Sequence, residues 1–337
     1  MGSIDNLMMR HCNFEWTEEY ELEFFVSLIG QEKRRKGNYM LSPQKEYRNE
    51  LVLWMKSVCK EFNFNLLTLH LACYILDSFM DEHEIRPFRL RLVATAALSI
   101  AAKFEEKTSD VPTFNEMFII ENPHNMEQAI SKDVIFQIEL RVFRYLDWNL
   151  HVPTVAHFVY FFLVTGLTEA DFNQRPEFTE NELRLALRDH LQEMLDHMLL
   201  DLWSLKVSPS WMASVCFIKA RHHLGLHPVW PLKFEELTKL SIINLQPAFK
   251  IAQRYDKLLV YQLEESSPND SGYRSAFSTP DSLPPQETSG TACSTSVRNT
   301  QFCPMSQEQS PSVTARSSGD SGDCVHRRVL FDDCEMK

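Results

Sequence analysis

The run Ala101-Ala102-Lys103-Phe104-Glu105-Glu106 closes a long apolar segment that begins near Pro87. A helix that is apolar on all sides is buried in a protein core. A cation, an aromatic ring and two carboxylates then appear abruptly, which marks the point where such a helix reaches solvent or a partner. A lysine at a helix C-terminus also complements the helix dipole. This run alone therefore leaves a binding role and a capping role open.

The composition favours a helical protein. The chain has 337 residues, enough for two domains and a tail, with 23 Phe and 6 Trp to build a core and only 9 Gly. Its net charge is −12, and no dense basic stripe is visible. A folded nucleic-acid binder usually presents a basic face. We therefore expect no nucleic-acid partner.

Sites for metals, cofactors and catalysis are not evident in the sequence. The 8 Cys are scattered without metal-ligand spacing, which predicts a reducing compartment and no cofactor. Two histidine groups, around His190 and His222, are interpreted as solvated helix faces. Neither a glycine-rich phosphate loop nor a nucleophile elbow is present, so we predict that the chain is not an enzyme. The longest apolar run, Leu92 to Ala102, is about half a membrane span, and we expect no membrane partner.

Helical periodicity predicts an all-α protein with four parts. Residues 1–41 are a polar leader with one helix, from Glu18 to about Lys36. Residues 42–152 and 153–263 are two helical domains. Residues 264–337 are rich in Ser, Thr, Pro and acidic residues, and we expect this tail to be disordered because it lacks core-forming residues.

Each helical domain is predicted to contain five helices. A serine followed by proline, at Ser42-Pro43 and at Ser208-Pro209, is typical of a capped helix start. The expected helices of the first domain are 43–62, 66–80, 87–106, 113–120 and 132–146. Those of the second domain are 154–164, 179–200, 208–223, 231–240 and 243–263.

The leader contains a basic cluster, Lys33-Arg34-Arg35-Lys36, followed by Gly37. We interpret the cluster as the last turn of the leader helix, where cations and a following glycine are favoured. The alternative is a nuclear localisation signal. We expect the protein in the nucleus, with the cytoplasm as a second location.

From Arg48 to Leu150 the sequence resembles a cyclin box. The box of that family carries an Arg in its first helix, an Asp in the second, a Leu and a Lys in the third and a Glu in the fifth. The matching residues, in this order, are Arg48, Asp77, Leu92, Lys103 and Glu139. The similarity continues to Leu263 and implies two tandem five-helix cyclin boxes.

The resemblance implies a regulatory subunit that binds and activates a cyclin-dependent protein kinase in cell-cycle control. Lys103 and Glu139 would hydrogen-bond backbone groups near the kinase C-helix and seat it in its active position. The apolar part of this seat would be Phe104, Phe143, Trp148 and Leu150. Arg48, Asp77 and Leu92 are expected to hold the box together. An internal salt bridge between Lys103 and Glu139, and a core position for Trp148, stay open.

A second implied site is a groove that docks Arg-x-Leu peptides of substrates or inhibitors. Its apolar lining would be Tyr47, Leu51, Trp54 and Leu90. Ser57 stands where the family usually has an acid, and Arg91 where it often has Gln. The sequence therefore predicts an apolar slot but leaves open how the slot would recognise the peptide arginine.

The tail carries three candidate phosphorylation sites before proline, Ser267, Thr279 and Ser310. We expect the tail to be dispensable for kinase binding and to control turnover. Its segment Arg327-Arg328-Val329-Leu330-Phe331 resembles the docking peptides, through Arg328, Leu330 and Phe331. We expect this segment to occupy the groove of its own or a neighbouring chain, unless the match is accidental.

Two other functions remain open at this point. A transcription scaffold with the same double box would need a basic face and usually a zinc ribbon. An orphan adaptor without kinase activation would be favoured by the loss of Lys103 or Glu139, and both are present.

Overall fold

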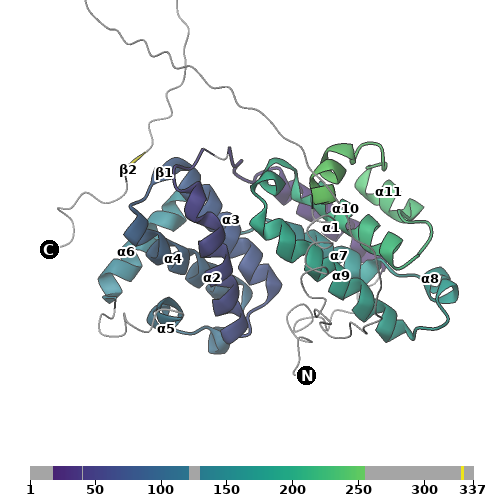
Figure 1. The fold of residues 1–337 in the computed structure, drawn as a ribbon, viewed down its shortest axis with the longest axis horizontal. Helices are drawn as coiled ribbons and strands as arrows, with labels where there is room; N and C mark the ends of the chain where they lie inside the picture. The colour runs from purple at the N-terminus through teal and green to yellow at the C-terminus, as the bar shows by residue number, and fades with distance from the viewer. Residues whose placement is uncertain (1–17, 40, 121–129, 255–327, 330–337) are drawn as a thin grey trace, which may run out of the picture. The chain divides into compact units, whose positions relative to one another are not determined.

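The computed structural model describes residues 18–39, 41–120, 130–254 and 328–329. Within these ranges the chain is mostly helical, and its two strands contain two residues each (Figure 1). The all-α prediction is thereby confirmed. The candidate phosphorylation sites Ser267, Thr279 and Ser310 lie outside the described residues.

Five helices, which we call the first bundle, follow the leader. They are α2 (Arg48–Glu61), α3 (Leu66–Glu82), α4 (Pro87–Glu105), α5 (Phe114–Ile119) and α6 (Lys132–Tyr145). Helix α4 is the centre of this bundle, because every residue from Val93 to Ala102 is at most 1% exposed. The alanines in that stretch have small side chains, which lets α3 pack closely along α4. Two short 3-10 helices, η1 (Lys45–Tyr47) and η2 (Thr108–Asp110), join these elements.

The first helix of this bundle begins later than predicted. Pro43 was expected to open it, whereas the α-helix starts at Arg48 and is preceded by the 3-10 turn η1. The reason is local, because the Ser42 hydroxyl accepts a hydrogen bond from the Gln44 backbone N–H at 3.2 Å. Such a bond between near neighbours stabilises a turn in place of a helix.

The second bundle contains α7 (Val155–Thr165), α8 (Glu169–Gln174), α9 (Glu180–Leu200), α10 (Pro209–His223), α11 (Leu232–Thr238) and the helical residues 246–254. A 3-10 helix, η4 (Leu202–Lys206), joins α9 to α10. Its core is aromatic: Phe217 stacks on Phe162 with ring centroids 5.2 Å apart, and both meet Trp230 and Phe234 edge-on. Helix α8 was not predicted. Its N-terminus is capped reciprocally by Thr168 and Asp171.

The leader helix α1 (Glu18–Glu32) packs on the second bundle. Phe25 inserts among Phe158, Phe161 and Phe162, with ring centroids 5.2 to 6.3 Å apart. The Glu32 carboxylate accepts hydrogen bonds at 2.8 Å from the Ser210 backbone N–H and hydroxyl, at the start of α10. An acid at a helix N-terminus is stabilising there, so Glu32 fixes the end of α1.

The basic cluster is not the last turn of the leader helix, as predicted, because α1 ends at Glu32. Arg35 instead lies over the Tyr74 ring, 4.4 Å from its centroid, and donates to the Pro153 carbonyl. Lys36 lies over the Tyr145 ring. Contacts with the first bundle thus override the local helix signal, and two of the four cations are engaged.

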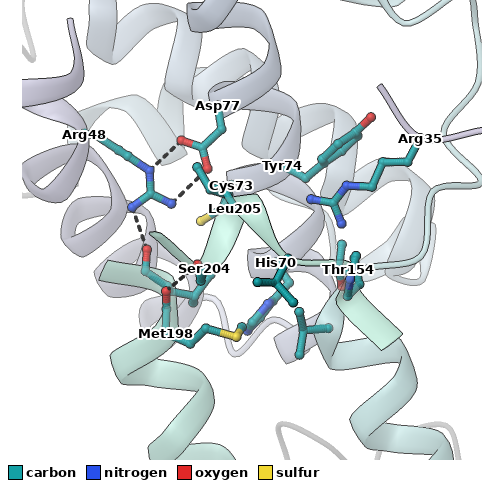
Figure 2. A pocket seen from close by; sticks show the side chains of 14 residues that line it. Arg35, Arg48, His70, Cys73, Tyr74, Asp77, Thr154, Met198, Ser204 and Leu205 are labelled. Carbon is teal, nitrogen blue, oxygen red and sulfur yellow. Dashed lines mark hydrogen bonds and ion pairs between the residues drawn. The ribbon is translucent and has the colours of Figure 1, made fainter. Parts of the chain in front are cut away.

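The two bundles are joined by Arg48, which is 2% exposed (Figure 2). Its guanidinium binds both carboxylate oxygens of Asp77 on α3, at 2.6 and 2.9 Å. Its Nη1 donates to the Leu199 carbonyl at the end of α9, at 2.7 Å. One side chain therefore connects two helices of the first bundle with the second bundle.

Candidate partner-binding site

The end of α4 and the middle of α6 bring Lys103 and Glu139 together at the surface. The Lys103 Nζ lies 2.6 Å from the Glu139 Oε1, and the Ser99 hydroxyl donates to the same oxygen at 2.8 Å. The Lys103 side chain is 52% exposed and that of Glu139 14%. Among the described residues, Oε2 of Glu139 accepts no hydrogen bond, and Lys103 uses one of its ammonium hydrogens. A donor and an acceptor thus stand side by side, open to a partner.

Aromatic side chains surround this ion pair. Phe104 follows Lys103, is partly exposed, and meets the His151 ring edge-on at 5.1 Å. Trp148 is 64% exposed and stacks on Phe143 with ring centroids 5.3 Å apart. Leu150 is half-buried. We call the surface formed by Lys103, Glu139, Phe104, Phe143 and Trp148 the Lys103 face.

Phe136, an exposed ring on α6, is not among the residues predicted from the sequence for this site. It stands three residues before Glu139 and seven before Phe143, which is the spacing of one helix face. This spacing was visible in the sequence and could have identified the residue. Phe136 extends the apolar part of the Lys103 face along α6.

The backbone holds Trp148 on the surface in an uncommon conformation. Asp147 and Trp148 have φ angles of 52° and 60°, in the left-handed region that glycine favours. The turn ends α6, because the Trp148 N–H donates to the Phe143 carbonyl at 2.9 Å. A non-glycine residue in this region costs about 1–2 kcal/mol. Strain that presents an exposed tryptophan is an indication of a functional surface.

The predicted docking groove lies between α2 and α4, but its lining is largely covered. Leu51, Trp54 and Leu90 are almost fully buried, and Tyr47 is half-buried. The Arg91 guanidinium lies 4.7 Å from the centroid of the Trp54 ring, whose Nε1 donates to the Ile120 carbonyl. Ser57, which stands in place of the usual acid, donates to the Trp54 carbonyl. The groove therefore stays a prediction, and in this conformation its residues are core.

Leu92, the remaining box residue, is half-buried on α4 and packs against the core. Asp77 pairs with Arg48 as described above. The structure thus brings Arg48 and Asp77 together and places Leu92 in the wall of the first bundle.

A small cavity of about 40 Å³ lies where the leader, the first bundle and the second bundle meet (Figure 2). His70, Cys73 and Tyr74 line it from α3, Arg35 from the leader and Thr154 from the start of α7. The His70 Nε2 is buried and has no hydrogen-bond partner among the described residues. Burial, together with smaller contributions from the nearby positive charges of His157 and Arg35, lowers the pKa of His70 from 6.5 to about 3. The joint therefore holds a neutral imidazole.

We expect His70 to make folding sensitive to acid. Its folded-state pKa lies below its unfolded-state value, so the unfolded chain takes up the proton first and stability falls as the pH drops from about 6.5 toward 3. The slope is about 1.4 kcal/mol per pH unit, or about 2 kcal/mol between pH 6.5 and pH 5. Urea unfolding at these two pH values should show the loss, and His70→Gln should remove it.

The control for this experiment is His222→Gln, because His222 is exposed at the end of α10. This variant should keep the wild-type pH dependence. If both variants keep it, the acid sensitivity arises from another group.

Neither a metal site nor a membrane span is found in the described part of the chain. No group of three or more His, Cys, Asp or Glu side chains there could hold a metal ion, although His190 and His223 lie close, with ring centroids 4.1 Å apart. In the same ranges, no helix has both the length and the apolar character needed to cross a bilayer.

Comparison with known proteins agrees with this geometry. Residues 23–151, which include the first bundle, match the family described as cyclin, N-terminal domain. Cyclin-J of Xenopus laevis is 28% identical over 236 residues, which are 70% of this chain and 62% of that protein. Human cyclin-J is 31% identical over 201 residues, 59% of this chain and 51% of that protein. The chain thus spans less than two thirds of either relative.

A solved structure shows the same fold. A viral cyclin from herpesvirus saimiri superposes with a TM-score of 0.52 at 14% sequence identity, covering 69% of this chain and 96% of that one. At this identity the likeness concerns the fold alone. The sequence matches show that residues 23–151 carry a cyclin N-terminal domain and that the chain is similar to cyclin-J.

Proposed function

We propose that this chain binds and activates a cyclin-dependent protein kinase as its regulatory subunit, in cell-cycle control. The observation that carries the proposal is the Lys103 face, where a charged donor and a charged acceptor stay open to solvent among exposed rings. Charge-assisted hydrogen bonds fix the orientation of a partner. Buried aromatic anchors supply most of the affinity in protein interfaces. A helix with free backbone groups at one end and an apolar side fits this combination.

The kinase C-helix is such a partner. A protein kinase is active only when the Glu of its C-helix pairs with the catalytic Lys, so the position of this helix controls activity. In our proposal Lys103 donates to backbone carbonyls near the C-helix, and Glu139 accepts from backbone N–H groups. Phe104, Phe136 and Trp148 cover its apolar side.

Binding only the inward position of the C-helix shifts the kinase population toward the active state. The chain then makes and breaks no covalent bond itself, and the kinase supplies all catalytic groups. This role agrees with the regulatory character of cyclins, and it requires neither a cofactor, a nucleic acid nor a membrane. Docking of Arg-x-Leu substrates belongs to the proposal as a second step, at the groove of Tyr47, Leu51, Trp54 and Leu90, whose covered lining would first have to become exposed.

We also propose a nuclear location, with the cytoplasm as the second. Arg35 and Lys36 contact the first bundle, whereas Lys33 and Arg34 are exposed. An import receptor that needs the whole basic cluster would have to displace the two engaged side chains.

The proposal is tested by titrating the full-length chain onto purified cyclin-dependent kinases and measuring affinity and phosphorylation of a peptide substrate. At least one kinase should be bound and activated. If every kinase of a broad panel stays unbound and inactive, the proposed function is wrong.

Trp148→Gly is the variant that separates binding from folding. We expect about 10- to 30-fold weaker kinase binding, because an exposed aromatic anchor is lost. The free energy of unfolding should stay the same or rise by up to about 1 kcal/mol, because glycine adopts the positive φ of this position without strain. Calorimetric titration and urea unfolding measure the two effects.

The matched control is Trp203→Ala, which removes a partly exposed tryptophan in η4 of the second bundle. Its kinase affinity should equal that of the wild type. Unchanged affinity of Trp148→Gly for a kinase that the wild type activates would place the kinase on another surface.

A further inference from the structure

The end of the chain contains a strand that pairs with the first bundle. Strand β2 (Arg328–Val329) lies parallel to β1 (His83–Glu84), the two-residue strand between α3 and α4 (Figure 1). His83 stands opposite Arg328, and Glu84 opposite Val329. The sequence predicted that this segment docks in the groove of Tyr47, Leu51, Trp54 and Leu90. The structure seats Arg328 and Val329 on β1 instead, while Leu330 and Phe331 lie outside the described residues.

Strand β1 is a firmly held edge. The His83 ring stacks on Phe79 with centroids 4.2 Å apart, meets Tyr145 edge-on, and its Nδ1 lies 2.9 Å from the Phe79 carbonyl oxygen. Ile85, the next residue along the chain, is almost fully buried. A strand edge presents backbone donors and acceptors to any segment that can add to it. Because β1 is already ordered, strand addition here has a low entropic cost.

The charges of the two segments are complementary. Strand β1 belongs to the run Asp81-Glu82-His83-Glu84, in which Glu82 and Glu84 are exposed. The C-terminal segment is Arg327-Arg328-Val329-Leu330-Phe331, two cations followed by three apolar residues. Phe88, at the start of α4, adds an exposed aromatic ring four residues beyond Glu84. An acidic edge close to an apolar ring matches a basic segment that continues into an apolar one.

We propose that β1 is a docking edge and that its occupant is the C-terminal strand Arg328–Val329 of the same chain, bound by strand addition. The segment is tethered, which raises its local concentration toward the millimolar range and lets a weak contact persist. The docked segment excludes other peptides that carry two cations before an apolar stretch. This inference rests on the strand pairing and is independent of kinase binding.

The register can be tested by disulfide trapping in the full-length chain. Neighbouring strands lie about 5 Å apart, within the Cα separation that a disulfide bridges. Glu84→Cys is combined with Val329→Cys after Cys12, Cys293, Cys303, Cys324 and Cys334 are replaced by serine, which leaves the buried cysteines in place. The control pairs Val329→Cys with Glu61→Cys, an exposed position at the end of α2.

In dilute glutathione buffer, we expect the Glu84 pair to form its intramolecular disulfide at least about tenfold faster than the Glu61 pair, because proximity sets the rate at equal thiol reactivity. Equal rates would overturn the proposal. Crosslinks that form only between two chains would overturn the intramolecular assignment.

A second measurement tests the competition. Arg328→Pro with Val329→Pro removes both backbone N–H groups of β2 and should free the edge. A labelled peptide of residues 325–333 should then bind the full-length variant about tenfold or more tightly than it binds the wild type. Ser317→Pro with Ser318→Pro, a matched change elsewhere in the C-terminal segment, should behave as the wild type. Equal peptide affinity for all three chains would contradict self-docking on β1.

Discussion

Replacing Arg48 with alanine is expected to lower the free energy of unfolding by about 3–5 kcal/mol, the usual cost of breaking a buried ion pair. Arg48 is 2% exposed and makes three charge-assisted hydrogen bonds, two to Asp77 and one to the Leu199 carbonyl. Its removal leaves the Asp77 carboxylate buried without its counter-ion. The cost arises mainly from this unpaired charge.

Two controls separate the destabilisation caused by the unpaired Asp77 charge from the destabilisation caused by lost packing. Arg48→Met combined with Asp77→Leu should be much less destabilising than Arg48→Ala, because no buried charge is left. Arg184→Ala, which removes an exposed pair with Glu180 within α9, should cost about 0.5 kcal/mol or less. Urea unfolding gives all three values. A loss below about 1 kcal/mol for Arg48→Ala would show that the pair is not the joint we describe.

The same variant should uncouple the two bundles. The Arg48 side chain reaches the second bundle through its Nη1, which donates to the Leu199 carbonyl at the end of α9. Small proteins unfold in one step only while their parts are energetically connected. We therefore expect the unfolding curves of Arg48→Ala, followed by tryptophan fluorescence and by circular dichroism, to separate where those of the wild type coincide.

The long helices could be predicted closely from the sequence. Helix α4 was expected from Pro87 to Glu106 and runs from Pro87 to Glu105, because proline at its start and an apolar pattern on all sides are strong signals. The predicted helix boundaries are wrong where contacts with another part of the fold determine where a helix ends. Arg35 and Lys36 leave the helical path for tyrosines of the first bundle, and no local pattern encodes those partners.

The candidate site was predictable in part. The family resemblance pointed to Lys103 and Glu139, which the structure brings together, but the third member of the cluster, Ser99, depends on how α4 and α6 cross. The left-handed turn at Asp147 and Trp148 was not foreseeable, since aspartate tolerates a positive φ but a bulky tryptophan rarely adopts one. Strand β1 contains two residues between two helices, too short for a period-two pattern to appear in the sequence.

We expect the Lys103 face to lose most of its affinity for the kinase when its two charges are removed. Lys103→Ala combined with Glu139→Gln is expected to weaken kinase binding by at least about 100-fold, because two charge-assisted hydrogen bonds to the partner are worth about 1.5–3 kcal/mol each. The fold should tolerate the change within about 1 kcal/mol, since an exposed ion pair adds little to stability. Affinity for the activated kinase and the urea midpoint of the free chain measure the two effects.

The choice of glutamine at position 139 follows from Ser99. The Ser99 hydroxyl is almost fully buried and donates to Glu139 Oε1 at 2.8 Å. Glu139→Ala would leave this donor unpaired and add about 1–3 kcal/mol of destabilisation that has nothing to do with the partner. The amide oxygen of glutamine still accepts the bond, so Lys103→Ala with Glu139→Gln removes charge while it preserves the local packing.

The matched control is Arg184→Ala with Glu180→Gln, an exposed ion pair on α9 whose atoms lie 2.9 Å apart. It changes the same kinds of charge and should leave the kinase affinity at the wild-type value. The proposed bonds to the kinase are charge-assisted, so salt screens them. The difference in kinase affinity between the two double variants should therefore become smaller as the salt concentration rises. If the Lys103 variant activates the kinase as fully as the control, the C-helix is seated elsewhere, and Lys103 on α4 and Glu139 on α6 serve another partner.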